Sequence, residues 1–211
     1  LNLIEMPGFE ADDLIATICR QEYDGHHFVI YSSDFDLLQL AAADVSILTP
    51  HNQKKGIFFD PPAVKAKYGI SAQQIPDYKG LCGDSSDNLP GVKGIGPKTA
   101  TKLLQAFQTV ENLYQNLDQI SSKATRNKLE RDQESAFLCK ELATLITDVK
   151  IDPPKTQYNF DQFQLANCQT YFEEYELQSL KRKLPQTNQS PTEPKPASQT
   201  ATPTKSQPTL F

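Results

Sequence analysis

Acidic side chains gather at three separate places in the sequence, and their spacing suggests a site for divalent cations. The clusters are Glu10 with Asp12 and Asp13, then Asp34 with Asp36, and finally Asp84 with Asp87. If they converge on one pocket, each pair of carboxylates about 4 Å apart repels by roughly 4 kcal/mol at an effective dielectric near 20. Bound cations would relieve this repulsion, and oxygen-only ligands favour Mg²⁺ or Mn²⁺ over zinc. Two such ions can hydrolyse a phosphodiester, because one generates hydroxide and both stabilise the attacking and leaving oxygens.

A second interpretation of the acids is structural, because carboxylates also cap helix starts. Asp12 and Asp13 open a helical run over residues 14–19, so capping explains that cluster equally well. Asp34 and Asp36 are harder to explain in this way. They lie between a strand-like run over 28–31 and an apolar helical turn over 37–40. Sites in α/β folds are built at such carboxyl ends of strands.

A glycine hairpin follows the third acidic cluster and predicts a phosphate-binding site. Its glycines admit backbone conformations closed to other residues and let a phosphodiester approach closely, while the helix that follows presents its positive end to an anion. Pro97 suits the first turn of that helix. The segment 88–108 holds three lysines and no acid. We therefore expect DNA contacts from Gly91, Lys93, Gly94, Gly96, Lys98, Thr99 and Lys102. The alternative is an ordinary helix–turn–helix corner.

The elements that must position these residues form an α/β region followed by a helical one. We expect a helix from Ala11, strands near 28–31, 45–48 and 57–59, and a helix capped by Asp60. From residue 63 to about 148 the pattern is almost entirely helical, with a start at Thr109 and one helix over 122–146. That last helix carries a basic face, which is either solvated or a second contact to a DNA backbone. Its members are Lys123, Arg126, Lys128 and Arg131.

Composition fits this organisation. The chain has 211 residues, of which 38% are hydrophobic, enough for one core with appendages. Its net charge of −5 would be +2 without the seven proposed ligand acids, so an acidic total does not exclude a DNA partner. Four widely spaced cysteines predict buried, reduced thiols in a cytoplasmic protein. No apolar run is long enough to span a bilayer. Residues 185–211 are rich in Pro, Thr, Ser and Gln, so we expect a disordered tail or linker.

Four motifs, taken in order and spacing, resemble the 5′ nuclease family, and most closely the 5′→3′ exonuclease domain of bacterial DNA polymerase I. They are Glu10-Ala11-Asp12-Asp13, Asp34-Phe35-Asp36, Gly83-Asp84-x-x-Asp87-Asn88 and the hairpin Gly91-Val92-Lys93-Gly94-Ile95-Gly96. The likeness runs from about residue 3 to residue 184. It implies a partial PIN-like sheet over 1–60 and a helical region with a helix–hairpin–helix over 61–184.

The resemblance also implies an activity. The acids would bind two Mg²⁺ or Mn²⁺ ions, and the enzyme would remove 5′ flaps and RNA primers. Glu10, Asp12 and Asp13 would serve the first metal, Asp34 and Asp36 would bridge or support it, and Asp84 and Asp87 would hold the second. Family members also bind a monovalent cation such as K⁺ through hairpin carbonyls.

Two features qualify the implied activity. The family's first strand, with its own metal-site Asp, and its basic helical arch are not found in this sequence, so we expect a truncated nuclease. A non-catalytic DNA-binding fragment is the alternative. At the other end, Gln207, Leu210 and Phe211 belong to a pentapeptide similar to the Gln-x-x-Leu-Phe peptides that bind the bacterial sliding clamp. The alternative for this tail is a linker to a following polymerase domain.

Overall fold

A computed structural model describes residues 3–20, 27–50, 56–151 and 165–184. The chain divides into two compact units, Leu1–Lys155 and Thr156–Phe211. The first unit holds all seven proposed metal ligands and the glycine hairpin. The predictions for the tail over 185–211, including the clamp-binding residues Gln207, Leu210 and Phe211, lie outside the described residues.

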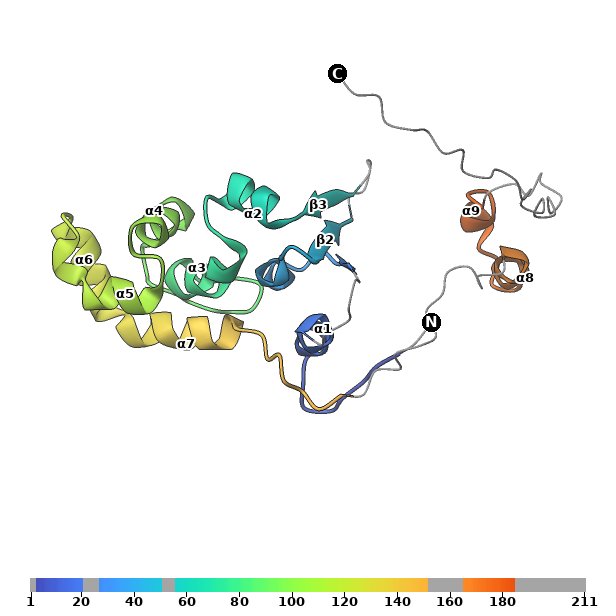
Figure 1. Ribbon diagram of the computed structural model, residues 1–211, viewed down its shortest axis with the longest axis horizontal. Helices are drawn as coiled ribbons and strands as arrows, with labels where there is room; N and C mark the ends of the chain where they lie inside the picture. The colour runs from blue at the N-terminus through green and yellow to red at the C-terminus, as the bar shows by residue number, and fades with distance from the viewer. Residues whose placement is uncertain (1–2, 21–26, 51–55, 152–164, 185–211) are drawn as a thin grey trace, which may run out of the picture. The chain divides into compact units, whose positions relative to one another are not determined.

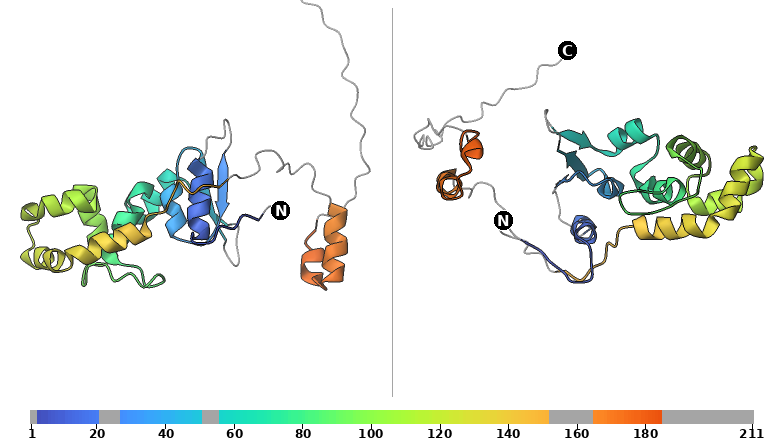
Figure 2. Two further views of the ribbon diagram at one scale, coloured as in Figure 1. Left: turned by 90° about the horizontal axis from the view of Figure 1, so that it is seen from below. Right: turned by 180° about the vertical axis from the view of Figure 1, so that it is seen from behind.

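A small mixed sheet forms one end of the first unit. Its strands are β1 (Phe28–Tyr31), β2 (Val45–Thr49) and β3 (Ile57–Phe59), in the order β1-β2-β3. Strands β1 and β2 are parallel, with Ile30 opposite Ile47, whereas β2 and β3 are antiparallel. The 3₁₀ helix η1 (Asp36–Leu40) lies in the connection between β1 and β2. Helix α1 (Ala11–Arg20) lies alongside the sheet (Figure 2). The three predicted strands and the first helix are confirmed.

Helices make up the rest of the first unit and extend away from the sheet (Figure 1). In chain order they are α2 (Pro61–Tyr68), η2 (Ala72–Gln74), α3 (Ile75–Cys82), α4 (Pro97–Phe107), α5 (Val110–Gln115), η3 (Leu117–Gln119), α6 (Lys123–Arg131) and α7 (Gln133–Ala143). The predicted caps are confirmed, because Asp60 accepts from the Ala63 amide and Thr109 accepts from the Asn112 amide. The second unit contains α8 (Leu165–Glu174) and α9 (Gln178–Lys181). No helix in the described part of the chain is long and apolar enough to cross a membrane.

The single helix predicted over 122–146 is wrong, because the chain breaks at Asp132. This residue has φ −109° and ψ 25°, outside the helical range, and separates α6 from α7. Its carboxylate accepts a hydrogen bond from the backbone amide of Lys93, 2.8 Å away, and pairs with Arg131. These contacts with the hairpin hold the break in place, and apolar periodicity alone cannot reveal them.

One hydrophobic core joins the sheet to the helices. Ile47 of β2, Leu37 of η1 and Val64 of α2 pack into the same buried cluster as Leu81 of α3 and Leu104 of α4. Since this core is continuous, the segments that carry the acidic clusters and the hairpin are held on one packed body.

The segment after α7 returns to α1 and closes the first unit (Figure 1). Asp13 accepts a hydrogen bond from the amide of Ile146 at 2.9 Å, and Thr17 accepts one from the amide of Val149 at 3.3 Å. Thr17 is buried. Helix α1 is therefore fixed by residues more than 130 positions away in sequence.

Candidate metal centre and nucleic-acid interface

The second and third acidic clusters stand on a β-to-α junction and on a short loop. Asp34 follows β1 and accepts the amide of Asp36 at 3.0 Å, so this turn is closed by its own side chain. Asp84 and Asp87 lie in the loop between α3 and the hairpin, where the backbones of Asp84 and Leu89 bond each other in both directions. Each cluster is thus built on a defined turn rather than on an open loop.

Two glycines allow this loop to fold back on itself. Gly83 and Gly91 have φ values of 72° and 58°, in the left-handed region. A Cβ on Gly91 would lie 2.2 Å from the amide nitrogen of Gly83, so no larger residue fits at this crossing. The crossing places the hairpin directly beside the Asp84 loop. Gly91 itself is buried, whereas Gly94 and Gly96 of the hairpin are exposed, and the DNA contact predicted at Gly91 stays a prediction.

Lys79 is the centre of the acidic site, and sequence reasoning missed it. Its side chain is 2% exposed, and its Nζ contacts Asp36, Asp84 at 2.7 Å and Asp87 at 2.7 Å. Burial lowers the pKa of Lys79, but the contacts of its ammonium with the three carboxylates outweigh burial and raise it. A lysine within the apolar helix α3, five residues before Asp84, was the signal in the sequence.

The pKa values of two carboxylates around Lys79 shift in opposite directions. Burial raises the pKa of Asp84, but hydrogen bonds from Lys79 and Ser86 outweigh burial and lower it to about 2. Asp36 is more deeply placed, so burial prevails over Lys79 and raises the pKa of this carboxyl. The Asp36 Oδ1 atom is fully buried and contacts the ammonium without forming a well-oriented hydrogen bond among the described residues.

Asp12 extends the acidic site toward α1. Burial and, to a smaller extent, the charges of Asp34, Asp36 and Glu10 together raise the pKa of Asp12 to about 6. The structure therefore brings Asp12, Asp34 and Asp36 into one electrostatic group, with Glu10 at its exposed edge.

Asp13 is turned away from this group. One of its oxygens accepts the amide of Glu10 at 3.2 Å, and the other accepts the amide of Ile146 at 2.9 Å. Both are contacts that hold α1 in place, as the capping interpretation of this cluster anticipates.

The donor chemistry of the site fits a hard divalent cation, although the arrangement is not that of a filled metal site. The ligand atoms that the site offers are carboxylate oxygens, and the buried Oδ1 of Asp36 lacks a hydrogen bond among the described residues. Yet within the described residues no group of three or more His, Cys, Asp or Glu side chains is arranged to hold a metal ion. The Lys79 ammonium accounts for this, because it stands where three of the carboxylates meet.

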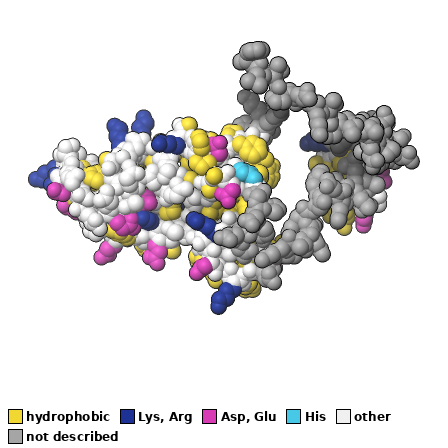
Figure 3. Space-filling view, in the orientation of Figure 1, with side chains coloured by type: hydrophobic (Ala, Val, Ile, Leu, Met, Phe, Trp, Pro, Cys, Tyr) yellow, Lys and Arg dark blue, Asp and Glu magenta, His cyan; other side chains and the backbone are white. Residues whose placement is uncertain are grey.

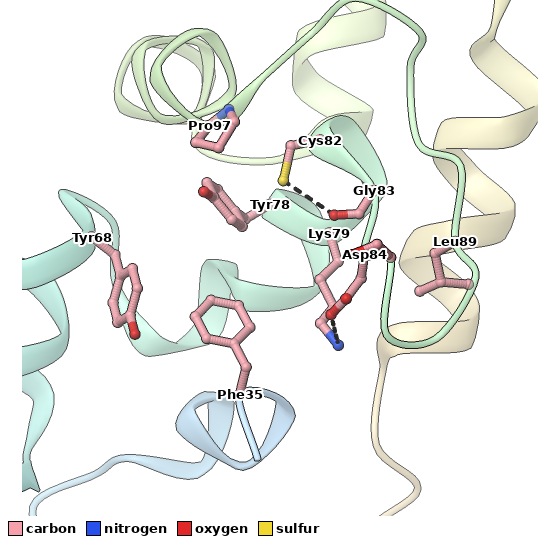
Figure 4. Close-up of a pocket in the computed structure, with 10 residues that line it drawn as sticks. Phe35, Tyr68, Tyr78, Lys79, Cys82, Gly83, Asp84, Leu89 and Pro97 are labelled. Carbon is pink, nitrogen blue, oxygen red and sulfur yellow. Dashed lines mark hydrogen bonds and ion pairs between the residues drawn. The ribbon is translucent and has the colours of Figure 1, made fainter. Parts of the chain in front are cut away.

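An open pocket of about 470 Å³ lies between this site and the hairpin (Figure 4). Lys79 and Asp84 point toward each other in it, and Pro97 at the start of α4 lines the opposite side. Three aromatic rings form one wall. Phe35 meets Tyr68 edge to face at 5.1 Å and lies 6.1 Å from Tyr78. Of the site's carboxylates, Asp84 thus shares this cavity with the start of α4.

The hairpin is braced from behind by α6 and α7. The Lys128 ammonium donates to the carbonyl of Gly94 at 3.0 Å, and Arg131 donates to the carbonyl of Lys93 at 3.2 Å. Ser135 donates to the carbonyl of Gly91 at 2.7 Å. With the contact of Asp132, which lies between the two helices, to the Lys93 amide, four side chains fix the hairpin backbone. The basic face predicted on this segment therefore serves in part to hold the hairpin.

The outer face of the hairpin stays open. Gly94, Gly96, Lys98 and Lys102 are exposed, and Gly96 caps α4 without a side-chain hydrogen bond. In the orientation of Figure 3, basic side chains gather over α4 and toward the α6 end, whereas acidic ones lie below them along α5 and α7. The uncapped helix start and the lysines near it suit an anionic ligand.

Two family models match the chain in succession. The N-terminal resolvase-like domain of 5′-3′ exonuclease matches residues 1–69, and the C-terminal SAM fold of 5′-3′ exonuclease matches residues 70–169. DNA polymerase I of Bacillus subtilis is 40% identical over 189 residues, which are 87% of this chain and 21% of that protein. The thermostable DNA polymerase I of Thermus thermophilus is 41% identical over 150 residues, 71% of this chain and 17% of that protein. The chain spans about a fifth of the length of these relatives.

Solved structures of bacteriophage T5 proteins share the fold. The T5 5′-exonuclease with bound divalent zinc ions is 25% identical with a TM-score of 0.59, over 67% of this chain and 52% of that one. The T5 D15 flap endonuclease, in a pseudo-enzyme-product complex with DNA and metal ions, matches with the same identity, TM-score and coverage.

Proposed function

This chain belongs to the 5′-3′ exonuclease family, and we propose that it forms part of a metal-dependent 5′→3′ exonuclease or 5′-flap endonuclease that hydrolyses phosphodiesters in DNA and in RNA primers. The observation that carries the proposal is the meeting of Asp36, Asp84 and Asp87 around one buried cation, beside a glycine hairpin that opens a helix. Lys79 and Asp84 of this centre line the same cavity as Pro97, the first residue of the helix that the hairpin opens.

In the proposed enzyme, two Mg²⁺ or Mn²⁺ ions would be held by two groups of carboxylates, with Asp36 lying between the groups. Asp12 and Asp34, with Glu10 at the edge, would serve one ion, and Asp84 with Asp87 would serve the other. When bound, such ions supply a hydroxide nucleophile and stabilise the developing charge on the phosphate. Asp13, predicted as a further ligand, would act by fixing α1 through its bonds to backbone amides.

DNA would lie across the outer face of the hairpin. Lys98, Lys102 and the first turn of α4, which includes Thr99, would contact phosphates, and Lys93 would add charge from the hairpin tip. A K⁺ ion at the hairpin remains part of the proposal. The carbonyls of Gly91, Lys93 and Gly94 each accept a side-chain hydrogen bond but retain a second lone pair for such an ion.

Partners beyond DNA are proposed from the relatives. Because those are DNA polymerases, a polymerase domain following this chain is one context for it, and a sliding clamp bound through the tail is another. The four cysteines are free, which supports a reducing compartment such as the cytoplasm. We retain residues 1–60, 61–184 and 185–211 as the proposed functional division.

A second candidate is a DNA-binding module without catalysis. The observation that favours it is the Lys79 ammonium, which fills the point where a metal ion would otherwise meet Asp36, Asp84 and Asp87. The two candidates share the hairpin, so DNA binding alone does not separate them.

A labelled 5′-flap duplex incubated with this chain tests both candidates in one gel that reports binding and cutting. The reaction is run with Mn²⁺ and again with a chelator. A product near the flap junction that requires Mn²⁺ would support the nuclease. Structure-selective binding without product at any Mn²⁺ concentration would favour the binding module and reject catalysis by this chain.

A further inference from the structure

Lys79 is a buried cation whose environment is made almost wholly of acids. Burying a charged ammonium costs several kcal/mol unless it is paired and hydrogen bonded. Its three N–H groups face three carboxylates, one from η1 and two from the loop after α3. Lys79 therefore ties two segments of the site together through a single atom, Nζ.

The cluster around Lys79 contains more acidic groups than basic ones. One ammonium faces three carboxylates, and Asp12 and Asp34 stand beside Asp36 on its other side. Both oxygens of Asp84 are already engaged, one with Lys79 and the other with the amide of Ser86 at 2.8 Å. A divalent cation entering here would have to compete with the ammonium for the same oxygen atoms.

The pocket offers the ammonium a second position. Lys79, Phe35, Tyr68 and Tyr78 line the same open cavity of about 470 Å³. The Nζ atom already lies 5.9 Å from the centre of the Phe35 ring, within the range of a cation–π contact. A flexible four-carbon stem can carry the ammonium toward that aromatic wall without unfolding α3.

We infer that Lys79 is a positioning residue that acts as a tethered counter-cation, which holds Asp36, Asp84 and Asp87 together without metal and yields these oxygens when a divalent cation binds. This inference rests on the proposed function, because it takes the three carboxylates as metal ligands. Lys79 thereby sets the metal concentration at which the site fills. Its removal should destabilise the metal-free protein and tighten metal binding.

The test compares Lys79→Met, which keeps an unbranched apolar stem, with Lys65→Met on the exposed face of α2 as the matched control. Thermal unfolding is recorded in chelator and in Mn²⁺, and Mn²⁺ affinity is measured by calorimetry. We expect Lys79→Met to unfold at a lower temperature than wild type in chelator, to recover more than wild type on adding Mn²⁺, and to bind Mn²⁺ about tenfold more tightly. The control should match wild type throughout.

Other outcomes overturn the inference in distinguishable ways. If Lys79→Met loses the same stability with and without Mn²⁺ and binds the ion no more tightly than wild type, Lys79 has only a structural role. If wild type itself binds no Mn²⁺, both this inference and the metal centre of the proposed function fail. Cleavage activity is not part of this measurement.

If Lys79→Met does not fold in chelator, a second experiment on the wild-type chain tests the inference. The Lys79 ammonium, shielded from solvent, should give a slowly exchanging ¹H–¹⁵N signal in metal-free buffer. The conservative Lys79→Arg variant, which retains a cation, assigns that signal by its loss. We expect saturating Mg²⁺ to shift or broaden the signal, and an unchanged signal in the bound protein would overturn the inference.

Discussion

At the scale of the residue, Asp12 shows how burial and, after it, the neighbouring acids act on a carboxyl of the site. Its pKa is raised from 3.8 to about 6, so the folded chain holds this proton more tightly than the unfolded chain does. The stability that this proton contributes is present at about pH 4 and is lost as the pH rises through about 6.

Asp12→Asn should therefore stabilise the metal-free protein at neutral pH, because the amide imitates the neutral carboxyl. The difference in unfolding free energy from wild type should grow in favour of the variant between about pH 4 and pH 7, measured by denaturant titration in chelator. Glu130→Gln, at an exposed position on α6, is the control and should show no such trend. A difference that stays constant with pH would contradict the role assigned to Asp12.

The pair Asp84 and Asp87 provides a catalytic test. Asp84→Asn with Asp87→Asn keeps oxygen acceptors for the buried Lys79 but removes two negative charges that a metal ion needs. If the chain cuts the flap duplex, this double variant should abolish cleavage while DNA binding in a gel shift changes little. Retained cutting would reject the proposed metal ligands. Alanine is a poorer choice, since it would leave Lys79 buried with Asp36 as its remaining carboxylate.

The residues of the site could be predicted from the sequence only in part. The acids of the three clusters are visible because they recur at short spacings, and one pair follows a strand, where α/β folds build their sites. Lys79 was not predicted, because helical spacing shows only that it shares a helix with apolar residues. That its side chain turns inward to the acids depends on the packing of α3 against the rest of the core.

At the scale of the element, Asp132 links the α6–α7 corner to the hairpin. Asp132→Ala removes the acceptor of the Lys93 amide and the partner of Arg131, whereas Asp132→Asn removes the charge but keeps an oxygen acceptor. We expect faster hydrogen exchange at the Lys93 amide and weaker DNA binding in the alanine variant than in the asparagine variant. Equal exchange rates in the two variants would show that the hairpin does not depend on this brace.

Most elements could be predicted because residues close in sequence determine where they begin and end. The caps at Asp60, Thr109 and Ser122 use side-chain oxygens that accept backbone amides three residues later, and the three strands follow short apolar runs. The break at Asp132 could not be predicted in this way, since its cause is a contact with Lys93, 39 residues earlier.

At the scale of the whole molecule, net charge and local charge have opposite signs. The chain carries −5, yet the proposed DNA surface around α4 is basic, so binding should depend on a few lysines rather than on the total. Lys98→Ala should weaken binding to all DNA sequences about equally and reduce the salt slope of the affinity by about 1.

Fluorescence titration at several salt concentrations measures this slope. Lys65→Ala, which removes an exposed lysine of α2, is the matched control and should leave the slope unchanged. A loss confined to particular sequences, or an unaltered slope in Lys98→Ala, would show that Lys98 does not contact phosphate.

The return of the chain from α7 to α1 has a consequence for the order of events during synthesis. Asp13 and Thr17 find their partners only when Ile146 and Val149 exist, about 130 residues later. At roughly 5–20 residues per second, a ribosome needs on the order of ten seconds to reach them. Helix α1, which carries Asp12, can pack against η1 early, but these two bonds to it form only after the hairpin and the helices behind it have been synthesised.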